Sequence, residues 1–474
     1  MTKVDQARVQ GKIYFSGELI FTDSFVSVSS GFGNENTDSL VCRDSSGGLI
    51  IPATSFAGVL RRQLEMLYAL NEKEQVELAE LFGNSDKDGK NEKCSDIVFT
   101  DLYPYPTQES ETVVQQGVHI SREYLSAENK GKYDREIALN ERFTFFFYIE
   151  KTSGNDERCA KWRDRLASVL QPDNLLFLGG RNSVGNGWGR FGSVYMIDYD
   201  FTQPGKLKDF LLRKTNEKDF IRDFMKQGHH LLPAVASDVP GQPRAMIQLD
   251  YTVAFQDAFL VNDPDAEPDE NESDDDADFN FLTVGGRYTI PGSSIKGVFR
   301  HRSEMIAGTI DMTNEMIDDV FGCAGTETKE SAGNTPAKKS AIYFSYAFLD
   351  GQTPKKKLMN GVSIDRFTGG AAEAALFEFK LLMNATFKGS IIMELSGKTL
   401  PYLPFLYLVI RDIREQDLSF GFGRTKGWGR AVSFSYTITH SDLPGEMGMY
   451  FQGNDFNLDR LENLHKENVN REVI

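Results

Sequence analysis

Two glycine-rich segments of the chain interleave basic side chains in a pattern suited to binding phosphate. Residues 179–190 read GGRNSVGNGWGR, and residues 421–430 read GFGRTKGWGR. Glycine lets a ligand approach the backbone closely, and Arg181, Arg424 and Lys426 add positive charge beside it. Neither segment ends in the Gly-Lys-Ser/Thr of a nucleotide-binding loop, and neither has the surroundings of a dinucleotide site. A tight turn that packs a tryptophan is the structural alternative, and both interpretations hold in part.

A second pattern places hydroxyl and basic side chains at the start of a helix. Residues 51–61 read IPATSFAGVLR, and residues 290–300 read IPGSSIKGVFR. Ser55 can cap such a helix, and hydroxyls and free backbone amides at this end can hold a phosphate. The arginine that closes each pattern can reach the same nucleic-acid backbone or pair locally. An ordinary capped helix with a close-packing glycine is the alternative.

Other catalytic patterns are poor. His229 and His230 have no nearby cysteine or acidic pair, and the chain has no nucleophile elbow and no His-Glu-x-x-His. The four cysteines show neither Cys-x-x-Cys pairing nor zinc spacing, so we expect reduced thiols. No apolar run is long enough to span a membrane, and no secretory signal opens the sequence. We therefore expect a cytoplasmic protein without a membrane partner.

The chain repeats itself. Seven segments recur in the same order at offsets between 234 and 245 residues. The helix-start pattern recurs at 239, and residues 187–190 (GWGR) recur as residues 427–430 at 240. Such an ordered series predicts two copies of one domain. The predicted parts are a first domain at 1–200, a linker at 201–244, a second domain at 245–440 and a polar C-terminal tail at 441–474.

Each copy has the pattern of an α+β domain. In the first, strands are predicted at 11–25, 97–102 and 142–150, and helices begin at Ser55 and near Ala160. The order strand, helix, strand, strand, helix, glycine-rich turn and strand is that of a ferredoxin-like domain with long insertions. The linker is predicted to be partly helical around residues 209–225. The helix after Pro291 is predicted to bury Ile295, Val298, Phe299, Met305 and Ile306.

Net charge does not decide whether the partner is a nucleic acid. The chain has 474 residues, 40% of them hydrophobic, and a net charge of −17. Residues 263–278 hold ten acidic and no basic residues, and the rest of the chain carries only −7. An acidic run of this kind is usually a solvated loop, so local basic patches matter more than the total.

Four segments taken in order resemble a known family. IPGSSIKGVFR, VFG, NGVSIDRFTGGA and GFGRTKGWGR look like the RAMP (repeat-associated mysterious protein) superfamily of CRISPR systems. More closely, the chain is similar to the backbone subunits of type III effector complexes, the Csm and Cmr class, in the double-domain form of type III-D-like systems. The resemblance covers both copies. It implies tandem RNA-recognition-motif-like domains, an α+β fold of ferredoxin-like topology, stacked along a guide RNA with thumb hairpins wedged between guide–target segments.

The resemblance also implies which residues contact RNA. Residues at the helix starts would touch guide phosphates, residues in the hairpins would begin the thumbs, and residues in the glycine-rich turns would line the RNA path. They are Ser55, Arg61, Ser294, Lys296 and Arg300 at the helices, Arg122 and Arg366 in the hairpins, and Arg181, Arg424 and Lys426 in the turns. Ala57 stands where the second copy has Lys296, so the first copy is expected to bind RNA more weakly there.

In the family, a loop aspartate ahead of the helix start cleaves the target RNA. Asp38 precedes an Arg43-Asp44 pair and Ile51-Pro52 at the spacing of that pattern, so it is the catalytic candidate of the first copy. An aspartate there can help to deprotonate a 2′-hydroxyl, or can recruit Mg²⁺ or another divalent cation near the scissile phosphate.

The second copy departs from the pattern. The 239-residue offset places Asp38 on Ala277, and no Arg-Asp pair follows. Asp276 and Asp278 flank that alanine and are weaker candidates, of which Asp278 lies closest in register. One cut, or two cuts at a fixed spacing, are both open.

The expected function is that of a guide-RNA-binding backbone subunit of a type III CRISPR ribonucleoprotein that cleaves guide-paired target RNA. Its expected partners are the guide RNA, the complementary target RNA and other effector subunits. One alternative is a catalytically silent scaffold of the same complex. Another is a stand-alone RAMP endonuclease that matures guide precursors, which the lack of a well-placed histidine base disfavours.

Overall fold

The computed structural model describes most of the chain between residues 8 and 472. Outside the described residues lie 1–7, 30, 32, 34–36, 69, 85–93, 106–108, 122–123, 125, 173, 213–244, 264–276, 326–335, 352–353, 441–442, 444 and 473–474. The chain divides into two compact units. The first comprises residues 1–114, 135–182 and 186–243, and the second comprises residues 115–134, 183–185 and 244–474.

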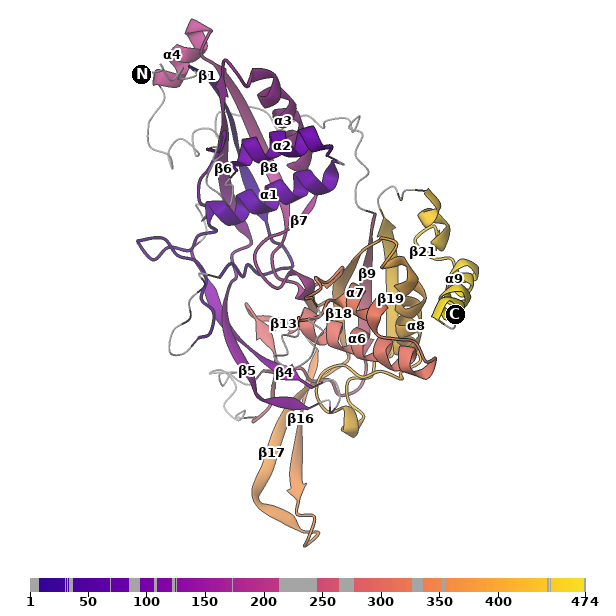
Figure 1. The fold of residues 1–474 in the computed structure, drawn as a ribbon. Helices are drawn as coiled ribbons and strands as arrows, with labels where there is room; N and C mark the ends of the chain where they lie inside the picture. Colours follow the sequence, from indigo (N-terminus) through magenta and orange to yellow (C-terminus); the bar gives the residue numbers. More distant parts are fainter. Residues whose placement is uncertain are drawn as a thin grey trace, which may run out of the picture. The chain divides into compact units, whose positions relative to one another are not determined.

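An antiparallel sheet with three helices on one face forms the first unit (Figure 1). The strand order is β2-β6-β1-β8-β7, with β3 beside β6. Helix α4 lies on the opposite face, where Phe210 packs against Tyr14 and Tyr199. The elements in this half of the chain are β1 (Val9–Ile20), α1 (Ala53–Leu67), α2 (Glu72–Phe82), β2 (Ile97–Phe99), β3 (Tyr103–Pro104), β4 (Thr112–Ile120), β5 (Ala127–Ala138), β6 (Arg142–Thr152), α3 (Asp156–Val169), β7 (Leu175–Phe177), η1 (Asn182–Val184), β8 (Trp188–Asp200) and α4 (Pro204–Leu212).

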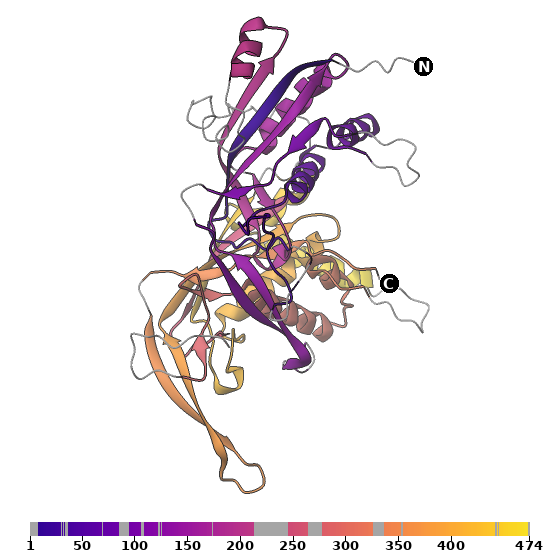
Figure 2. The same ribbon diagram turned by 90° about the vertical axis from the view of Figure 1, so that its left-hand side faces the viewer.

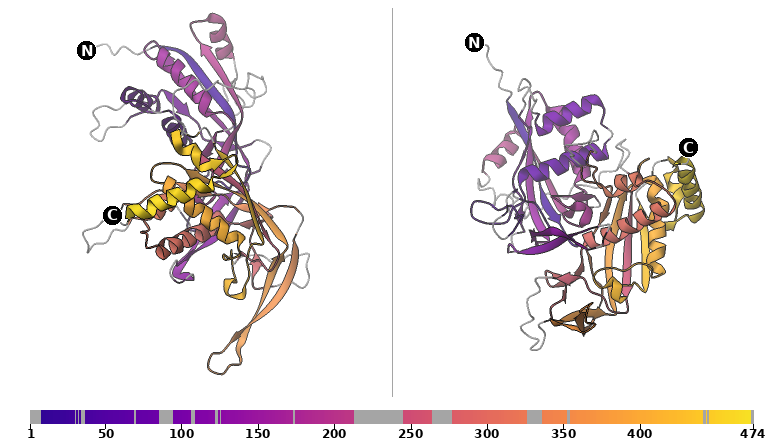
Figure 3. Two further views of the ribbon diagram at one scale, coloured as in Figure 1. Left: turned by 90° about the vertical axis from the view of Figure 1, so that its right-hand side faces the viewer. Right: turned by 60° about the horizontal axis from the view of Figure 1, so that its bottom comes forward.

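The second unit repeats this plan with a longer hairpin. Its sheet runs β12-β13-β15-β18-β9-β19, with β14 beside β18. Figure 3 shows α6 and α8 over one face of the sheet and α9 next to α8. The elements are β9 (Met246–Phe255), β10 (Asn262–Asp263), β11 (Asn280–Phe281), β12 (Thr283–Val284), β13 (Arg287–Ile290), α6 (Gly292–Thr309), α7 (Glu315–Phe321), β14 (Ile342–Phe344), β15 (Ala347–Leu349), β16 (Lys355–Ile364), β17 (Ala371–Met383), β18 (Ala385–Glu394), η2 (Leu400–Tyr402), α8 (Leu403–Arg414), η3 (Arg424–Lys426), β19 (Ser433–His440), η4 (Gly445–Tyr450), β20 (Phe451–Gln452), β21 (Asp455–Phe456) and α9 (Leu458–Glu472).

The strand order confirms the predicted ferredoxin-like fold. Numbered by their place in the βαββαβ plan, the main strands lie in the order 2-3-1-4 in both units. In the first unit these are β2, β6, β1 and β8, and in the second they are β14, β18, β9 and β19. The predicted strand at 142–150 is β6, and the predicted helix near Ala160 begins four residues earlier, at Asp156.

The prediction that Ser55 caps the first helix is wrong. Helix α1 already begins at Ala53, and its first amide donates a 2.7 Å hydrogen bond to the Asp101 carboxylate. Pro52 is the N-cap residue, so Ser55 lies inside the first turn, and the Asp101 carboxylate accepts from the first amide in place of a capping hydroxyl. The prediction that α6 buries Met305 is also wrong. Met305 is 44% exposed, and Ser303 is buried against the core of the second unit instead. The row of residues 295, 299, 303 and 307, each four apart, forms the buried stripe.

The C-terminal segment is polar in composition, but it folds. Helix α9 buries Leu461 and Leu464 against the second core, and Phe451 and Phe456 of the β20–β21 hairpin join them. A polar sequence suffices because only one stripe of the helix contacts the core. In the linker, α4 covers the start of the predicted helical stretch, and residues 213–225 lie outside the described residues.

Candidate nucleic-acid interface

A short segment of the first unit, residues 25–29, joins three of the predicted features. Its backbone bonds to the inner hairpin strand β5, to the glycine-rich turn and to the loop that follows Asp38. Because each contact uses backbone atoms, the arrangement depends little on side-chain identity. The bonded pairs are Val26–Ala138, Ser27–Gly180, Phe25–Gly187 and Val28–Cys42.

Residues 258–261 of the second unit make the same connections. Their backbone bonds again reach the inner hairpin strand, here β17, the glycine-rich turn and the loop after Asp278. The equivalent bonds therefore set the register between the two copies more firmly than the sequence matches do. The bonded pairs are Phe259–Leu382, Leu260–Phe422, Ala258–Gly429 and Val261–Leu282.

The structural register corrects the predicted match of the two GWGR segments. The 3-10 turns Asn182–Val184 and Arg424–Lys426 correspond at an offset of 242, not 240. Gly187 and Gly429 are then equivalent: both have φ near +70°, at 70° and 75°. A Cβ at either position would meet a backbone carbonyl oxygen at less than 2 Å, 1.8 Å for Gly187 and 1.9 Å for Gly429. Only glycine fits this conformation, so the backbone requirement overrides the apparent letter match.

The two tryptophans consequently have different surroundings. Trp188 packs edge-on against Phe177, and its ring N–H donates to the carbonyl of Asn182 at 2.7 Å. Trp428 is buried against Phe379. At the offset of 242 it lies two positions before the counterpart of Trp188. The basic residues of the turns, Arg181, Arg424 and Lys426, are exposed, as the phosphate interpretation requires.

Asp38 and Asp278 occupy equivalent places. Both aspartates are exposed. The residue after each one forms a parallel β-bridge with the inner hairpin strand, Ser39 with Arg135 and Phe279 with Phe379. The offset of this loop is therefore 240, so the counterpart of Asp38 is Asp278 and not Ala277, which is buried. Among the described residues, the candidate of the second copy is thus Asp278, and Asp276 lies outside them.

The Asp278 carboxylate has a fixed partner. Its Oδ2 accepts a 2.9 Å hydrogen bond from the backbone N–H of Glu378 on β17. The next residue continues the attachment, since Phe279 donates to the carbonyl of Glu378 at 3.1 Å and accepts from the amide of Lys380 at 2.9 Å. One carboxylate oxygen of Asp278 is therefore engaged at the hairpin base.

An aromatic stack joins the three features of the second unit. Phe279 from the aspartate loop stacks on Phe379 of β17 with ring centroids 4.7 Å apart, and on Phe422 of the glycine-rich turn at 5.5 Å. The ammonium group of Lys426 lies 4.2 Å from the centre of the Phe379 ring. A cation over an aromatic face is attracted by the ring quadrupole, so Lys426 is held near this stack while it remains exposed.

The helix-start residues of the first copy are partly open to solvent. The side chain of Arg61 is 41% exposed and pairs with Glu65, one turn along α1, at 3.2 Å. Ser55 and its counterpart Ser294 are half-buried within the first turns of α1 and α6. The first amide of α1 is not free for a phosphate, because Asp101 already accepts from it.

Two basic residues of α6 have internal partners. Arg300 donates to Glu304, to Asp318 at 2.7 Å and to the carbonyl of Gly322 at 2.6 Å, and so ties α6 to α7. Lys296 donates to the hydroxyl of Ser340 at 3.0 Å. Burial, and then the charge of Arg300, lowers the pKa of Lys296 to about 8. Arg300 therefore links α6 to α7 in this structure, while Lys296 is a half-buried lysine whose pKa lies below its ordinary value.

Both hairpins present apolar side chains to solvent. Figure 2 shows β16 and β17 extending well beyond the sheet of the second unit. Phe367 at the tip is 100% exposed, and Arg366 beside it is exposed too. The tip is ordered by Asp365, whose carboxylate accepts from the amides of Phe367 and Thr368 at 2.7 and 3.1 Å. In the first copy Tyr124 is exposed near the hairpin tip, and Arg122 lies outside the described residues.

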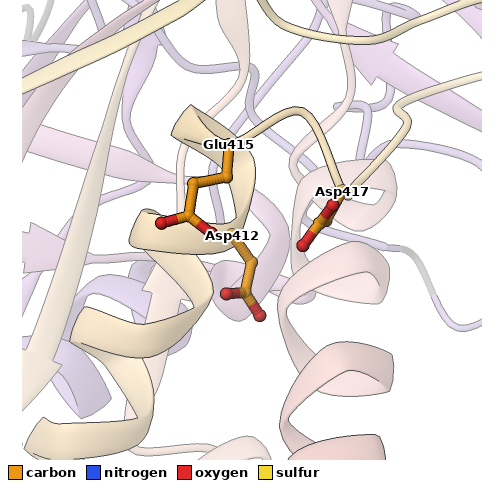
Figure 4. Close-up of side chains that lie close together, drawn as sticks. All are labelled: Asp412, Glu415 and Asp417. Atoms are coloured by element: carbon orange, nitrogen blue, oxygen red, sulfur yellow. The ribbon is translucent and has the colours of Figure 1, made fainter.

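One trio of acidic side chains elsewhere has a structural explanation. Asp412, Glu415 and Asp417 bring carboxylate oxygens within 4.8 Å of one another at the end of α8, the only such group among the described residues (Figure 4). Asp412 is 2% exposed and accepts from Arg302 at 2.6 Å and from Arg411 at 2.8 Å. Two guanidinium groups thus balance its charge, so the trio needs no cation.

Sequence reasoning missed one residue near Asp38. Glu136 of β5 binds the loop that follows Asp38, through its backbone and through its carboxylate. Arg43, its ionic partner, belongs to the Arg-Asp pair noted in the sequence, but Glu136 lies 93 residues away. No local pattern signals such a pairing, because it arises only when β5 folds back against the loop.

Comparison with known proteins agrees with the fold. The RAMP superfamily model matches residues 21–191 and 271–433, which together make up more than half of the chain. A search of curated proteins finds no match to the chain. No helix among the described residues is long and apolar enough to cross a membrane. The two matched regions lie within the two ferredoxin-like folds, and the chain belongs to the RAMP superfamily of CRISPR-associated RNA-binding proteins.

Proposed function

We propose that the chain is a guide-RNA-binding backbone subunit of a type III CRISPR ribonucleoprotein, and that Asp38 cleaves the guide-paired target RNA. One repeated arrangement carries the proposal. In each unit an exposed aspartate, Asp38 or Asp278, stands beside the inner strand of a hairpin and near a glycine-rich turn with exposed basic side chains. Guide binding through backbone and shape leaves sequence recognition to base pairing.

The proposed chemistry needs one carboxylate and the RNA itself. Asp38 takes the proton of a 2′-hydroxyl, and the resulting oxygen attacks the adjacent phosphorus to form a 2′,3′-cyclic phosphate. The 5′-oxygen of the next nucleotide leaves and takes a proton from water. Mg²⁺ or another divalent cation would supply charge stabilisation at the phosphate when bound. Asp38 fits such a cation, because Mg²⁺ is commonly held by one or two carboxylates together with substrate phosphate oxygens.

The second unit supports a weaker version of the same proposal. Asp278 is equivalent to Asp38 in register, but one of its oxygens already accepts from Glu378. The second copy also lacks the Arg-Asp pair that follows Asp38, so cleavage by the second unit is expected to be slower than by the first. A silent second unit, acting only as an RNA-binding scaffold, is the candidate that this hydrogen bond favours. Asp276 stays a proposed alternative to Asp278.

The test is target-RNA cleavage by the assembled, guide-loaded complex with Mg²⁺ or chelator. Asp38→Ala is expected to slow one specific cut by about 100-fold or more while target binding survives. Asp278→Ala and Asp276→Ala, alone and combined with Asp38→Ala, show whether a second cut exists. Asp459→Ala, which removes an exposed carboxylate on α9, is the charge-matched control. If all products persist in the combined variant, the chain is a scaffold and another subunit cuts.

A further inference from the structure

The loop that follows Asp38 is attached to a single residue of β5, Glu136, through every second residue: Ser39, Val41 and Arg43. The amide of Glu136 donates to the carbonyl of Ser39 at 2.8 Å. Its Oε2 accepts from the amide of Val41 at 3.1 Å, and its Oε1 accepts from Nη2 of Arg43. Since Ser39 directly follows Asp38, the position of that aspartate along the hairpin depends on Glu136.

The attachment is electrostatically strong because the carboxylate is shielded from water. The Glu136 side chain is only 9% exposed, and Nη2 of Arg43 also donates to the hydroxyl of Thr112 at 3.3 Å. Burial by itself raises the pKa of Glu136. The hydrogen bonds from Thr112, the Val41 amide and Arg43 outweigh burial, so the pKa lies below its ordinary value. The carboxylate is therefore ionised at neutral pH, and its bonds are charge-assisted.

The second copy keeps the backbone part of this attachment and replaces the side chains. Lys380 stands at the position of Glu136, and its amide donates to Phe279 as the amide of Glu136 donates to Ser39. At the same 240-residue offset that relates the loops, Thr283 stands at the position of Arg43. The second loop is instead packed by its aromatic stack. The Arg43–Glu136 pair thus belongs to the first copy.

We infer that Glu136 is a positioning residue for Asp38, which holds the loop so that the carboxylate stands at a fixed place beside β5. The inference rests on the proposed cleavage by Asp38. Glu136 touches no reacting atom in this scheme and acts through the Ser39–Arg43 backbone. Removing its charge weakens the bonds to Val41 and Arg43 and leaves the backbone bond to Ser39 in place. A displacement of about 1 Å at a reacting group can cost about 100-fold in rate.

The experiment compares Glu136→Gln with Asp38→Ala and wild type in the assembled complex, by single-turnover cleavage at saturating target RNA. Glu136→Gln is expected to slow the Asp38-dependent cut by about 10- to 100-fold with unchanged target affinity. Hydrogen exchange of the segment that contains Val41 is expected to speed up. Glu141→Gln, five residues along the chain and exposed, should leave both the cut and the exchange as in wild type.

A second variant separates positioning from loss of folding. Arg43→Gln removes the other half of the pair at a more exposed site, 39% against 9% for Glu136. It should slow the same cut, and Glu136→Gln/Arg43→Gln should recover part of the rate because two amides can hydrogen-bond to each other. If Glu136→Gln and Arg43→Gln both cut at the wild-type rate while Asp38→Ala does not cut, the inference is wrong. If Asp38→Ala itself cuts normally, the proposed function fails first.

Discussion

The two aspartate loops have the same backbone pairing but different side-chain attachments. In the first unit an ion pair between Arg43 and Glu136 holds the loop after Asp38. In the second unit the loop after Asp278 is held by Phe279, which stacks on Phe379 and Phe422. The comparison teaches that equivalent backbone bonds set the common register of the two loops, while different side chains attach each loop to its hairpin.

The helices of the two units differ in the same way. In the first, ion pairs join α2 to α3. Glu74 pairs with Lys161 and Arg165, Glu77 pairs with Lys161, and Glu80 pairs with Arg158. In the second, α8 is buried along an apolar face that includes Leu406, Val409 and Ile413. The contact between α2 and α3 therefore includes several ion pairs, whose contribution can be tested by stability measurements.

The largest expected effect on stability is that of removing the centre of the aromatic stack. Phe379 is buried and contacts Phe279, Trp428 and Lys426. Phe379→Ala should lower the free energy of unfolding of the second unit by about 3–5 kcal/mol, since it removes a buried ring and leaves a cavity. Phe367→Ala, which removes a fully exposed ring from the same hairpin, should change it by less than about 0.5 kcal/mol. Chemical denaturation measures both, and equal effects would contradict the packing role.

A smaller effect is expected from the helix position that is Lys296 in one unit and Ala57 in the other. The pKa of Lys296 in the folded chain is about 8, below its ordinary value of 10.5, because burial and Arg300 disfavour the charge. Between pH 8 and 10.5 the unfolded chain binds a proton that the folded chain does not. The stability of the second unit should therefore rise with pH in that window, and Lys296→Met should remove this contribution.

The measurement is denaturation at several pH values between about 7 and about 10. Lys398→Met, which removes an exposed lysine of the same unit, is the matched control. A pH profile that stays unchanged in Lys296→Met would show that the lysine is charged in the folded state throughout.

The smallest effect concerns the ion pairs of the first unit in acid. Burial by itself raises the pKa of Glu74, but the hydrogen bonds from Lys161 and Arg165 outweigh it and hold the pKa at about 2. The stabilisation is present above the unfolded pKa, about 4.3, and is lost as pH falls toward 2. Glu74→Gln should make the stability of the first unit depend less on pH in acid. Unfolding at each pH is followed by the helical circular dichroism signal. Glu72→Gln, which changes an exposed residue of the same helix, should leave this pH dependence unchanged. An equal effect of both variants would contradict the role given to Glu74.

Much of the fold could be predicted because duplication makes the pattern visible twice. The strand at Arg142–Thr152 and the helix after Pro291 followed from apolar spacing, and their counterparts agreed. Register was harder to predict. The match of GWGR at 240 misled, because the φ of Gly187 and Gly429 depends on close backbone contacts that a letter comparison does not contain.

The sequence by itself determined the two ferredoxin-like folds and the basic glycine-rich turns, since these depend on local spacing and on repetition, and its resemblance to the RAMP superfamily singled out Asp38 as a candidate. Only the tertiary structure decided that Asp278 is the counterpart of Asp38, that Arg300 is engaged by Asp318, and that Glu136 holds the Asp38 loop. The physical reason is distance along the chain. Such contacts join residues tens to hundreds of positions apart, and they form only once the strands have set the register.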